Sequence, residues 1–381
     1  MRSVFLFTLL SCLAATEAMP PERLALRALI SNGERWLVAQ QQPNGAFLPG
    51  NQFALGITEL ALDAMVHPPA TTVPPGSPAV DRAVRFILSY RQDDGGFYDP
   101  VEGMAVYGTS LAIIALRRAE RLDPAVALGA RDFLLRLQNR DPLSDCLGGI
   151  GFMPDHGAGN EDLHNTSHAI EALSSCGLSA SDPRGGQLLA FLERCQNRSR
   201  PGEPDRRPWV TNDGGGVYSP SQARAAGDWQ GAPGQDDAPP RLASYGSMTC
   251  ALISSYLALD LPADDPRVVA ALGWIRTHYS VSENPRMPAG KTAQGLYYHN
   301  ATLAKTLSLL RITTLDTSDG RRVDWRADLH RALRERATPV TLPDGTSACF
   351  WINADPRWAE GVPHLCTAYA IGALKRIDAS W

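Results

Sequence analysis

The sequence is poor in aromatic residues, in net charge and in long apolar runs. Its 381 residues include 7% aromatic and 20% charged residues, and the formal net charge is only −4. Acidic and basic residues are interleaved, so no block of one sign would attract nucleic acid or an anionic membrane surface. Beyond the N-terminal region, no segment approaches the about 20 apolar residues of a membrane-spanning helix. We therefore expect neither a nucleic-acid partner nor a transmembrane segment.

The N-terminal residues have the pattern of a secretion signal. Arg2 precedes an apolar run too short to cross a bilayer, and the small residues Thr16 and Ala18 stand where a signal peptidase reads the chain. We expect residues 1–18 to be a signal peptide and the protein to be exported, either to the periplasm or out of the cell. The alternative is residues 9–12 (LLSC), which resemble a lipoprotein box that would anchor the protein through a lipid on Cys12.

Six cysteines follow the expected signal peptide. An oxidising compartment permits disulfides, but a chain of this length does not depend on them to fold. Most of the six lie inside apolar helical runs, where buried free thiols are the simpler expectation. Cys349 and Cys366 flank one loop and are the pair best placed for a bridge. The six are Cys146, Cys176, Cys195, Cys250, Cys349 and Cys366.

One unit recurs about six times along the chain and predicts the fold. In the clearest copy, apolar residues recur at helical spacing over residues 80–90 with charged residues opposite, which indicates a surface helix with one buried stripe. Residues 92–97 (QDDGGF) end that helix, because glycine readily takes the positive φ of a turn. Residues 107–116 (YGTSLAIIAL) are apolar on nearly every side, which predicts an inner helix capped by Thr109 or Ser110.

The other copies repeat this order of surface helix, glycine-containing turn and inner helix. Because no polar capping repeat stands at either end, the pattern favours a closed ring over an open solenoid. We predict an all-α chain, an (α/α)6 toroid in a single domain over residues 25–378. Residues 202–240, rich in Pro, Gly, Arg and Asp, are predicted to form an inserted loop over one mouth of the ring.

The recurring signature is an aromatic residue, an aliphatic residue, a Gln shortly after them, and then Gly and an aromatic residue. It resembles the QW repeat of squalene and oxidosqualene cyclases and of protein prenyltransferase β subunits, with Phe, Tyr or Val where that family usually has Trp. Tyr279 replaces the Gln in the fifth copy, and the last copy has degenerated. The glutamines assigned to this signature are Gln41, Gln92, Gln138 and Gln196.

Four further stretches are similar to a bacterial group of exported prenyltransferase/squalene-oxidase-repeat proteins, which are named for their repeats. The resemblance covers nearly the whole mature chain. It implies the toroid fold of squalene cyclases and prenyltransferases but does not identify a reaction. The stretches are 212–215 (NDGG), 245–249 (YGSMT), 294–299 (QGLYYH) and 358–361 (WAEG).

The sequence lacks the motif of each chemistry that the resemblance suggests. The Asp-x-Asp-Asp with which the cyclases protonate an alkene is absent, and Asp162 beside His164 is its nearest stand-in, with helix capping as the alternative role. His364 resembles the zinc-binding His of the prenyltransferases, but no Asp-x-Cys precedes it. His164 and His168 share a helix face without a third ligand. We expect no metal and no cofactor.

The first turns of the inner helices in such a ring open on its central cavity, so polar and aromatic residues there form the candidate site. Tyr107, Asn165 and Tyr298 belong to this set as well. The alternative is that Tyr107, Asn165, Tyr245 and His299 cap helices and bond neighbouring loops. The predicted catalytic residues are Asp162, His164, Tyr245, His299, Glu360 and His364.

Three functions remain open on the sequence. The first is a cavity for a hydrophobic isoprenoid ligand, and an enzyme of this kind would be terpenoid cyclase-like or prenyltransferase-like. The second is a carbohydrate-active toroid acting on an oligosaccharide, which needs paired carboxylates or a Tyr/His base near an Arg. The third is a non-catalytic scaffold whose own side chains fill the ring.

Overall fold

The structure of the protein is a computed structural model. It describes residues 19–48, 50, 53–69, 72–101, 103–152, 160–199, 207, 209–221, 228–229 and 241–381. The expected signal peptide, Cys12 and most of the predicted insertion at 202–240 lie outside these residues. No helix in the described part of the chain has the length and apolar character needed to cross a bilayer.

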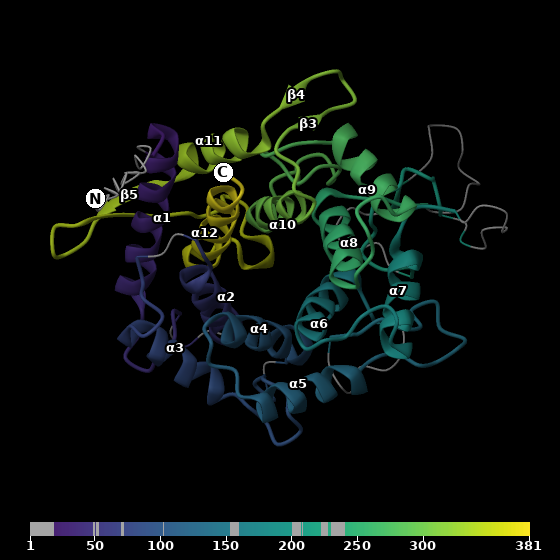
Figure 1. The fold of residues 1–381 in the computed structure, drawn as a ribbon, viewed down its shortest axis with the longest axis horizontal. Helices are drawn as coiled ribbons and strands as arrows, with labels where there is room; N and C mark the ends of the chain where they lie inside the picture. Colours follow the sequence, from purple (N-terminus) through teal and green to yellow (C-terminus); the bar gives the residue numbers. More distant parts are fainter. Residues whose placement is uncertain are drawn as a thin grey trace, which may run out of the picture.

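The described residues form twelve α-helices that alternate between an outer and an inner set (Figure 1). The inner helices are buried on nearly all sides, whereas the outer helices bury one face. The prediction of a mostly helical chain is confirmed. The outer helices are α1 (Pro21–Gln40), α3 (Pro78–Leu88), α5 (Pro124–Arg136), α7 (Pro183–Cys195), α9 (Pro266–Thr277) and α11 (Trp325–Arg336). The inner helices are α2 (Ala54–Val66), α4 (Ala105–Arg118), α6 (Leu163–Ser175), α8 (Gly246–Ala258), α10 (Leu296–Leu309) and α12 (Pro363–Ala379).

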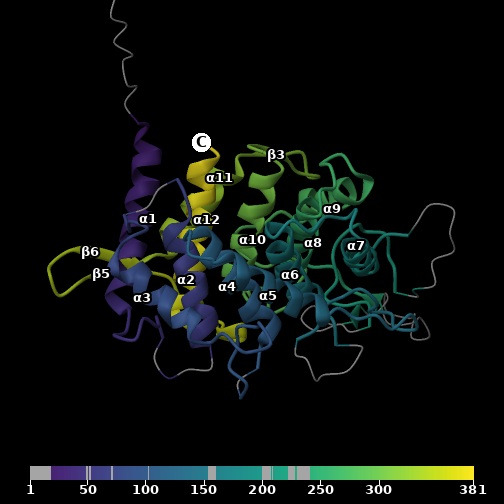
Figure 2. The ribbon, with the colours of Figure 1, turned by 60° about the horizontal axis from the view of Figure 1, so that its bottom comes forward.

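The inner helices contact one another in a closed cycle. Each inner helix packs against the next one along the chain, and α12 packs back against α2. Helix α1 joins the two ends of the chain, because it packs on α12 and its Arg23 and Arg27 pair with the buried Asp378 at 2.6 and 3.0 Å. Figure 2 shows α1 and α12 side by side.

The described residues also contain short antiparallel hairpins, which the sequence pattern did not predict. The longest joins β5 (Thr338–Thr341) to β6 (Ser347–Phe350), and β6 packs against α1. Its turn contains Gly345 at φ +82°, a left-handed conformation that glycine takes without strain. The others are β1 (Asp228–Trp229) with β2 (Arg241–Leu242), and β3 (Leu315–Asp316) with β4 (Arg322–Val323).

A threonine near the start of five inner helices holds the loop that precedes the helix. Its hydroxyl oxygen accepts a hydrogen bond from a backbone N–H of that loop. Thr109 therefore lies inside α4 and accepts from Phe97, so its predicted capping role, and that of Ser110, is wrong: α4 begins earlier, at Ala105. The five pairs are Thr58 with Phe47 (3.2 Å), Thr109 with Phe97 (2.8 Å), Thr166 with Ile150 (2.9 Å), Thr249 with Gly216 (3.0 Å) and Thr367 with Trp351 (3.0 Å).

Three of the repeat glutamines fasten their loop to the next outer helix. Gln41, Gln138 and Gln196 each donate from Nε2 to a carbonyl of their own turn and to the carbonyl of the second residue of the following outer helix. Gln92 is different, because its Nε2 donates to the Tyr90 and Tyr98 carbonyl oxygens of its own turn rather than to the next outer helix. Counting from Phe86, Arg91 stands at the repeat position, so the assignment of Gln92 to the repeat is corrected.

All six described cysteines are free thiols. The Cys349 sulfur lies 3.9 Å from the Leu29 carbonyl oxygen, and the Cys366 thiol donates to the Glu360 carbonyl oxygen at 3.0 Å. The predicted bridge between Cys349 and Cys366 is therefore wrong for this structure, because β6 and α12 direct the two sulfurs to different partners.

We expect Gln196→Ala to lower the free energy of unfolding by about 2–4 kcal/mol, because it leaves the Gly214 and Arg267 carbonyls without their donor and the buried Tyr256 hydroxyl without its acceptor. Urea denaturation followed by circular dichroism measures the change. Gln92→Ala is the matched control and should cost less than half as much. Equal decreases in the free energy of unfolding for the two variants would contradict the inference that Gln196 holds its turn to the next outer helix.

Candidate active site

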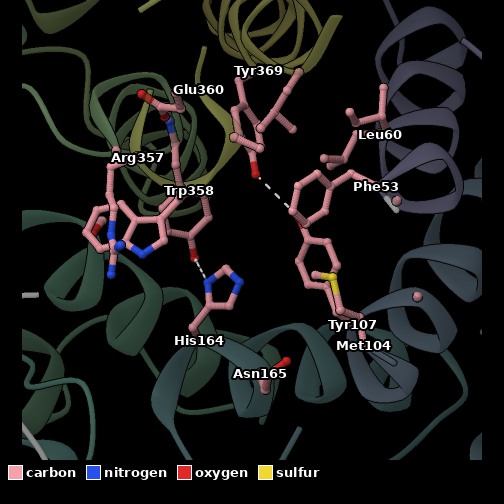
Figure 3. Close-up of a pocket in the computed structure, with 18 of the residues that line it drawn as sticks. Phe53, Leu60, Met104, Tyr107, His164, Asn165, Arg357, Trp358, Glu360 and Tyr369 are labelled. Atoms are coloured by element: carbon pink, nitrogen blue, oxygen red, sulfur yellow. Dashed lines mark hydrogen bonds between the residues drawn. The ribbon is translucent and has the colours of Figure 1, made fainter. Parts of the chain in front are cut away.

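A cavity of about 410 Å³ lies where the inner helices begin (Figure 3). Every inner helix contributes lining residues from its first turns or from the residue just before it, so the cavity sits at the N-terminal ends of all six. Its volume falls within the roughly 300–1,000 Å³ of small-molecule sites. Most of the wall is apolar or aromatic. The apolar part of the wall includes Phe53, Leu55, Leu60, Met104, Met248 and Leu365.

An aromatic cluster of three tyrosines and two histidines lies in the space enclosed by the cycle of inner helices, which we call the bore. The Tyr107 and His164 rings stack with centroids 5.4 Å apart, and the Tyr298 ring meets His164 edge-on at 5.1 Å. Figure 3 shows the two hydrogen bonds of the cluster, His164 Nδ1 with the Tyr298 hydroxyl at 3.1 Å and the Tyr107 hydroxyl with the Tyr369 hydroxyl at 3.3 Å. These residues come from α4, α6, α10 and α12, so only the ring of helices brings them together.

Burial keeps this cluster uncharged near neutral pH. It lowers the pKa of His164 and, together with the neighbouring His164 ring, lowers the pKa of His168 well below its ordinary value. Burial also raises the pKa of Tyr298 and Tyr369 well above the ordinary range. The imidazoles are therefore neutral and the phenols protonated, so these groups act as hydrogen-bonding groups rather than as ions.

Charged side chains occupy the bore toward the C-terminal ends of the inner helices. Asp63 of α2 pairs with Arg118 of α4, and Lys305 of α10 pairs with Glu171 of α6 at 2.5 Å. Burial alone would raise the pKa of Glu171, but the Lys305 ammonium lowers it to about 2. Basic residues are favourable at helix C-terminal ends, where the helix dipole is negative. The bore thus changes from an apolar cavity to an ionic layer over the length of the inner helices.

Three of the predicted catalytic residues, His164, Tyr245 and Glu360, line the cavity. The Glu360 carboxylate accepts backbone N–H bonds from Tyr297 at 3.3 Å and Tyr298 at 2.8 Å, in the first turn of α10, and an amide N–H bond from Asn353 at 2.6 Å. It therefore caps α10 from another element. Burial raises the pKa of Glu360, while these donors act in the opposite direction.

The other three predicted residues lie outside the cavity lining. Asp162 caps α6, because its carboxylate accepts from the Asn165 backbone N–H and side-chain amide, both at 2.8 Å. His299 is buried with its Nε2 3.1 Å from the Ser280 carbonyl oxygen. His364 packs on Trp36 with ring centroids 4.9 Å apart, and burial lowers its pKa to about 4. For Asp162 the capping alternative describes the observed bonds.

Tyr369 and Arg357 also line the cavity, although neither is among the residues predicted for the site. Tyr369 lies in the apolar α12, where only its spacing of four residues from Leu365 marks the cavity face. Arg357 precedes Trp358 and Ala359, which both take a left-handed backbone at φ +55° and +63°. Such residues are uncommon outside glycine, and this turn places Arg357 and the 45%-exposed Trp358 at the cavity rim.

Comparison with known proteins identifies the fold. No protein-family model matches the chain, and no curated protein sequence matches it. The type II terpene cyclase MstE from Scytonema, in complex with merosterolic acid A as product, gives a TM-score of 0.56 at 14% identity over 95% of this chain and 99% of that chain. The chain has a terpene cyclase fold. The predicted terpenoid cyclase-like fold is thus confirmed, at an identity too low to transfer an activity.

Two further structures agree with this result. MstE in complex with its substrate, geranylgeranyl dihydroxybenzoate, gives a TM-score of 0.54 at 12% identity over 95% of this chain and 99% of that chain. A protein from Actinoplanes gives a TM-score of 0.53 at 15% identity over 93% of this chain and 99% of that chain.

Among the described residues of the present chain, no group of three or more His, Cys, Asp or Glu side chains could hold a metal ion.

We expect Glu171→Gln to change how stability responds to acid. A carboxyl whose pKa is depressed on folding, from 4.5 to about 2, contributes stability above the unfolded value and loses it as the pH falls toward 2. The variant should be less stable at pH 7, by about 2–3 kcal/mol, and the gap should close between pH 4.5 and 2. Urea titrations across this range measure it, with Glu335→Gln, an exposed glutamate, as control. A gap that stays constant with pH would refute the assignment.

Proposed function

We propose that the cavity binds a hydrophobic isoprenoid ligand and that the protein acts as a terpenoid cyclase-like enzyme. The observation that best supports this proposal is the largely apolar cavity of about 410 Å³ at the starts of the inner helices. Burial of an apolar chain there would gain roughly 25 cal/mol per Å² of ligand surface. The faces of Tyr107, Tyr298 and Tyr369 could steady a developing cation. MstE, which shares the fold, binds geranylgeranyl dihydroxybenzoate as its substrate.

The two alternatives have less support. A scaffold was expected to fill the ring with its own side chains, whereas an open cavity is found there. A carbohydrate-active protein would use paired carboxylates. Asp99 and Glu360 both line the cavity, but the Glu360 carboxylate is already bonded to the start of α10. His164, Tyr298 and Arg357 do line the same cavity, so an oligosaccharide panel is included in the test.

We also propose that the closed cycle of inner helices is an (α/α)6 toroid in one domain over residues 25–378, and that the chain belongs with the exported prenyltransferase/squalene-oxidase-repeat proteins. The return of α12 to α2 supports the toroid. The apolar N-terminal run supports export after loss of residues 1–18, or anchoring through Cys12.

Native mass spectrometry with geranylgeranyl dihydroxybenzoate and geranylgeraniol tests the ligand class. We expect one molecule of either isoprenoid per chain with a dissociation constant in the micromolar range, and at least tenfold weaker binding after Leu60→Trp, which fills the cavity. Leu309→Trp, at a residue that is 51% exposed, is the matched control and should bind normally. Chromatography of the incubated isoprenoids then shows whether cyclised products form. Absence of isoprenoid binding, or turnover of an oligosaccharide instead, would overturn the proposal.

A further inference from the structure

Glu59 of α2 is a fully buried acid. Its side chain has no solvent exposure, and neither carboxyl oxygen has a hydrogen-bond partner among the described residues. Glu34 of α1 is equally buried, but it forms an ion pair with Lys375 at 2.6 Å and accepts a hydrogen bond from the Thr72 N–H at 2.7 Å. A buried carboxylate without such partners is so unfavourable that the group stays protonated. Burial accordingly raises the pKa of Glu59 well above its ordinary value.

The spacing of Glu59 along α2 places it on the side of the helix that faces the cavity, although it is not itself among the lining residues. It follows Leu55 by four residues and Gly56 by three, and both of these line the cavity, so Glu59 continues the same helix face one turn deeper. Asp63, a further turn along, already belongs to the ionic layer through Arg118. Side chains on a helix lean toward its N-terminus, which for α2 is the cavity end.

Tyr107 connects Glu59 to the cavity. The Tyr107 ring lies against α2, since a Cβ on Gly56 would come within 3.3 Å of its Cε1 atom. Burial and the neighbouring Glu59 carboxyl raise the pKa of Tyr107 to about 12. Its hydroxyl pairs with that of Tyr369 across the bore, at a rather long 3.3 Å. The two hydroxyls and the carboxylic acid together offer more donors and acceptors than their mutual bonds use.

We propose that the Tyr107–Tyr369 hydroxyl pair, with the neutral Glu59 carboxyl behind it, forms a polar subsite at the inner end of the cavity that receives an uncharged oxygen, a hydroxyl or a carbonyl, of the isoprenoid. Tyr107 and Tyr369 line the cavity and contact this oxygen. Glu59 is a positioning residue: it makes no hydrogen bond to Tyr107 in this structure, and its neutral carboxyl group orients the Tyr107 hydroxyl toward the ligand through its dipole. The inference rests on the proposed function and specifies which end of the ligand lies deepest.

The test compares geranylgeraniol with the C20 hydrocarbon of the same skeleton that lacks the hydroxyl group, each titrated into the full chain while its tryptophan fluorescence is followed. One additional hydrogen bond corresponds to about a tenfold preference for the alcohol. We expect this preference in the wild type, its reduction to less than twofold in Glu59→Leu, and its retention in Glu59→Gln, whose amide still donates and accepts. Because Glu59→Leu removes a buried polar group, it should also raise the melting temperature of the empty protein.

Glu34→Gln is the matched control, since it alters a buried acid that is paired. It should lower the melting temperature and keep the tenfold preference. A Glu59→Leu variant that still prefers the alcohol tenfold would overturn the subsite while leaving isoprenoid binding intact. A wild type that binds neither compound would overturn the proposed function and the subsite together, so the two failures are distinguishable.

Discussion

The turns that follow α1, α5 and α7 lie against the next outer helix, and their buried backbone N–H and carbonyl groups must find partners there. The repeat meets this constraint with two side chains. A threonine hydroxyl in the inner helix accepts from the N–H of the turn, and a glutamine amide donates both to the turn and to the start of the next outer helix. Because unpaired buried backbone groups are costly, these bonds fix how one helical hairpin sits beside the next. The rest of the structure depends on that placement.

Repetition of this placement puts the N-terminal ends of all the inner helices at one mouth of the bore. The cavity therefore draws its wall from every repeat, and no repeat contains a site by itself. Along the bore, the apolar wall gives way to the aromatic cluster and then to the ion pairs of Asp63 with Arg118 and Glu171 with Lys305. Paired charges can occupy this depth because each has its partner on a different inner helix.

Two acids near the cavity, Asp162 and Glu360, hold the helical frame, whereas Glu59 does not. Asp162 and Glu360 bond backbone N–H groups at the starts of α6 and α10, so their charge stabilises helix ends. Glu59 has no such bonds within the described part of the chain. The histidines and tyrosines of the aromatic cluster are held in their uncharged forms by burial, so the deep part of the cavity has polar atoms but little charge. Such a wall suits a ligand that is mostly hydrocarbon.

The pattern of residues was enough to predict the helices, their alternation between outer and inner sets, and the presence of residues such as His164, Tyr245 and Tyr298 at the starts of inner helices. Helical periodicity and glycine-containing turns are local signals, which a single sequence carries. It could not decide that Asp162 would cap α6, that Arg91 would stand where a glutamine was expected, or that Cys349 and Cys366 would remain apart. Nor could it reveal the burial of Glu59, because an acid in an apolar helix looks the same in the sequence whether it pairs, as Glu34 does with Lys375, or lacks a partner among the described residues. Only the tertiary structure decides this, since the partners come from helices far apart in the chain.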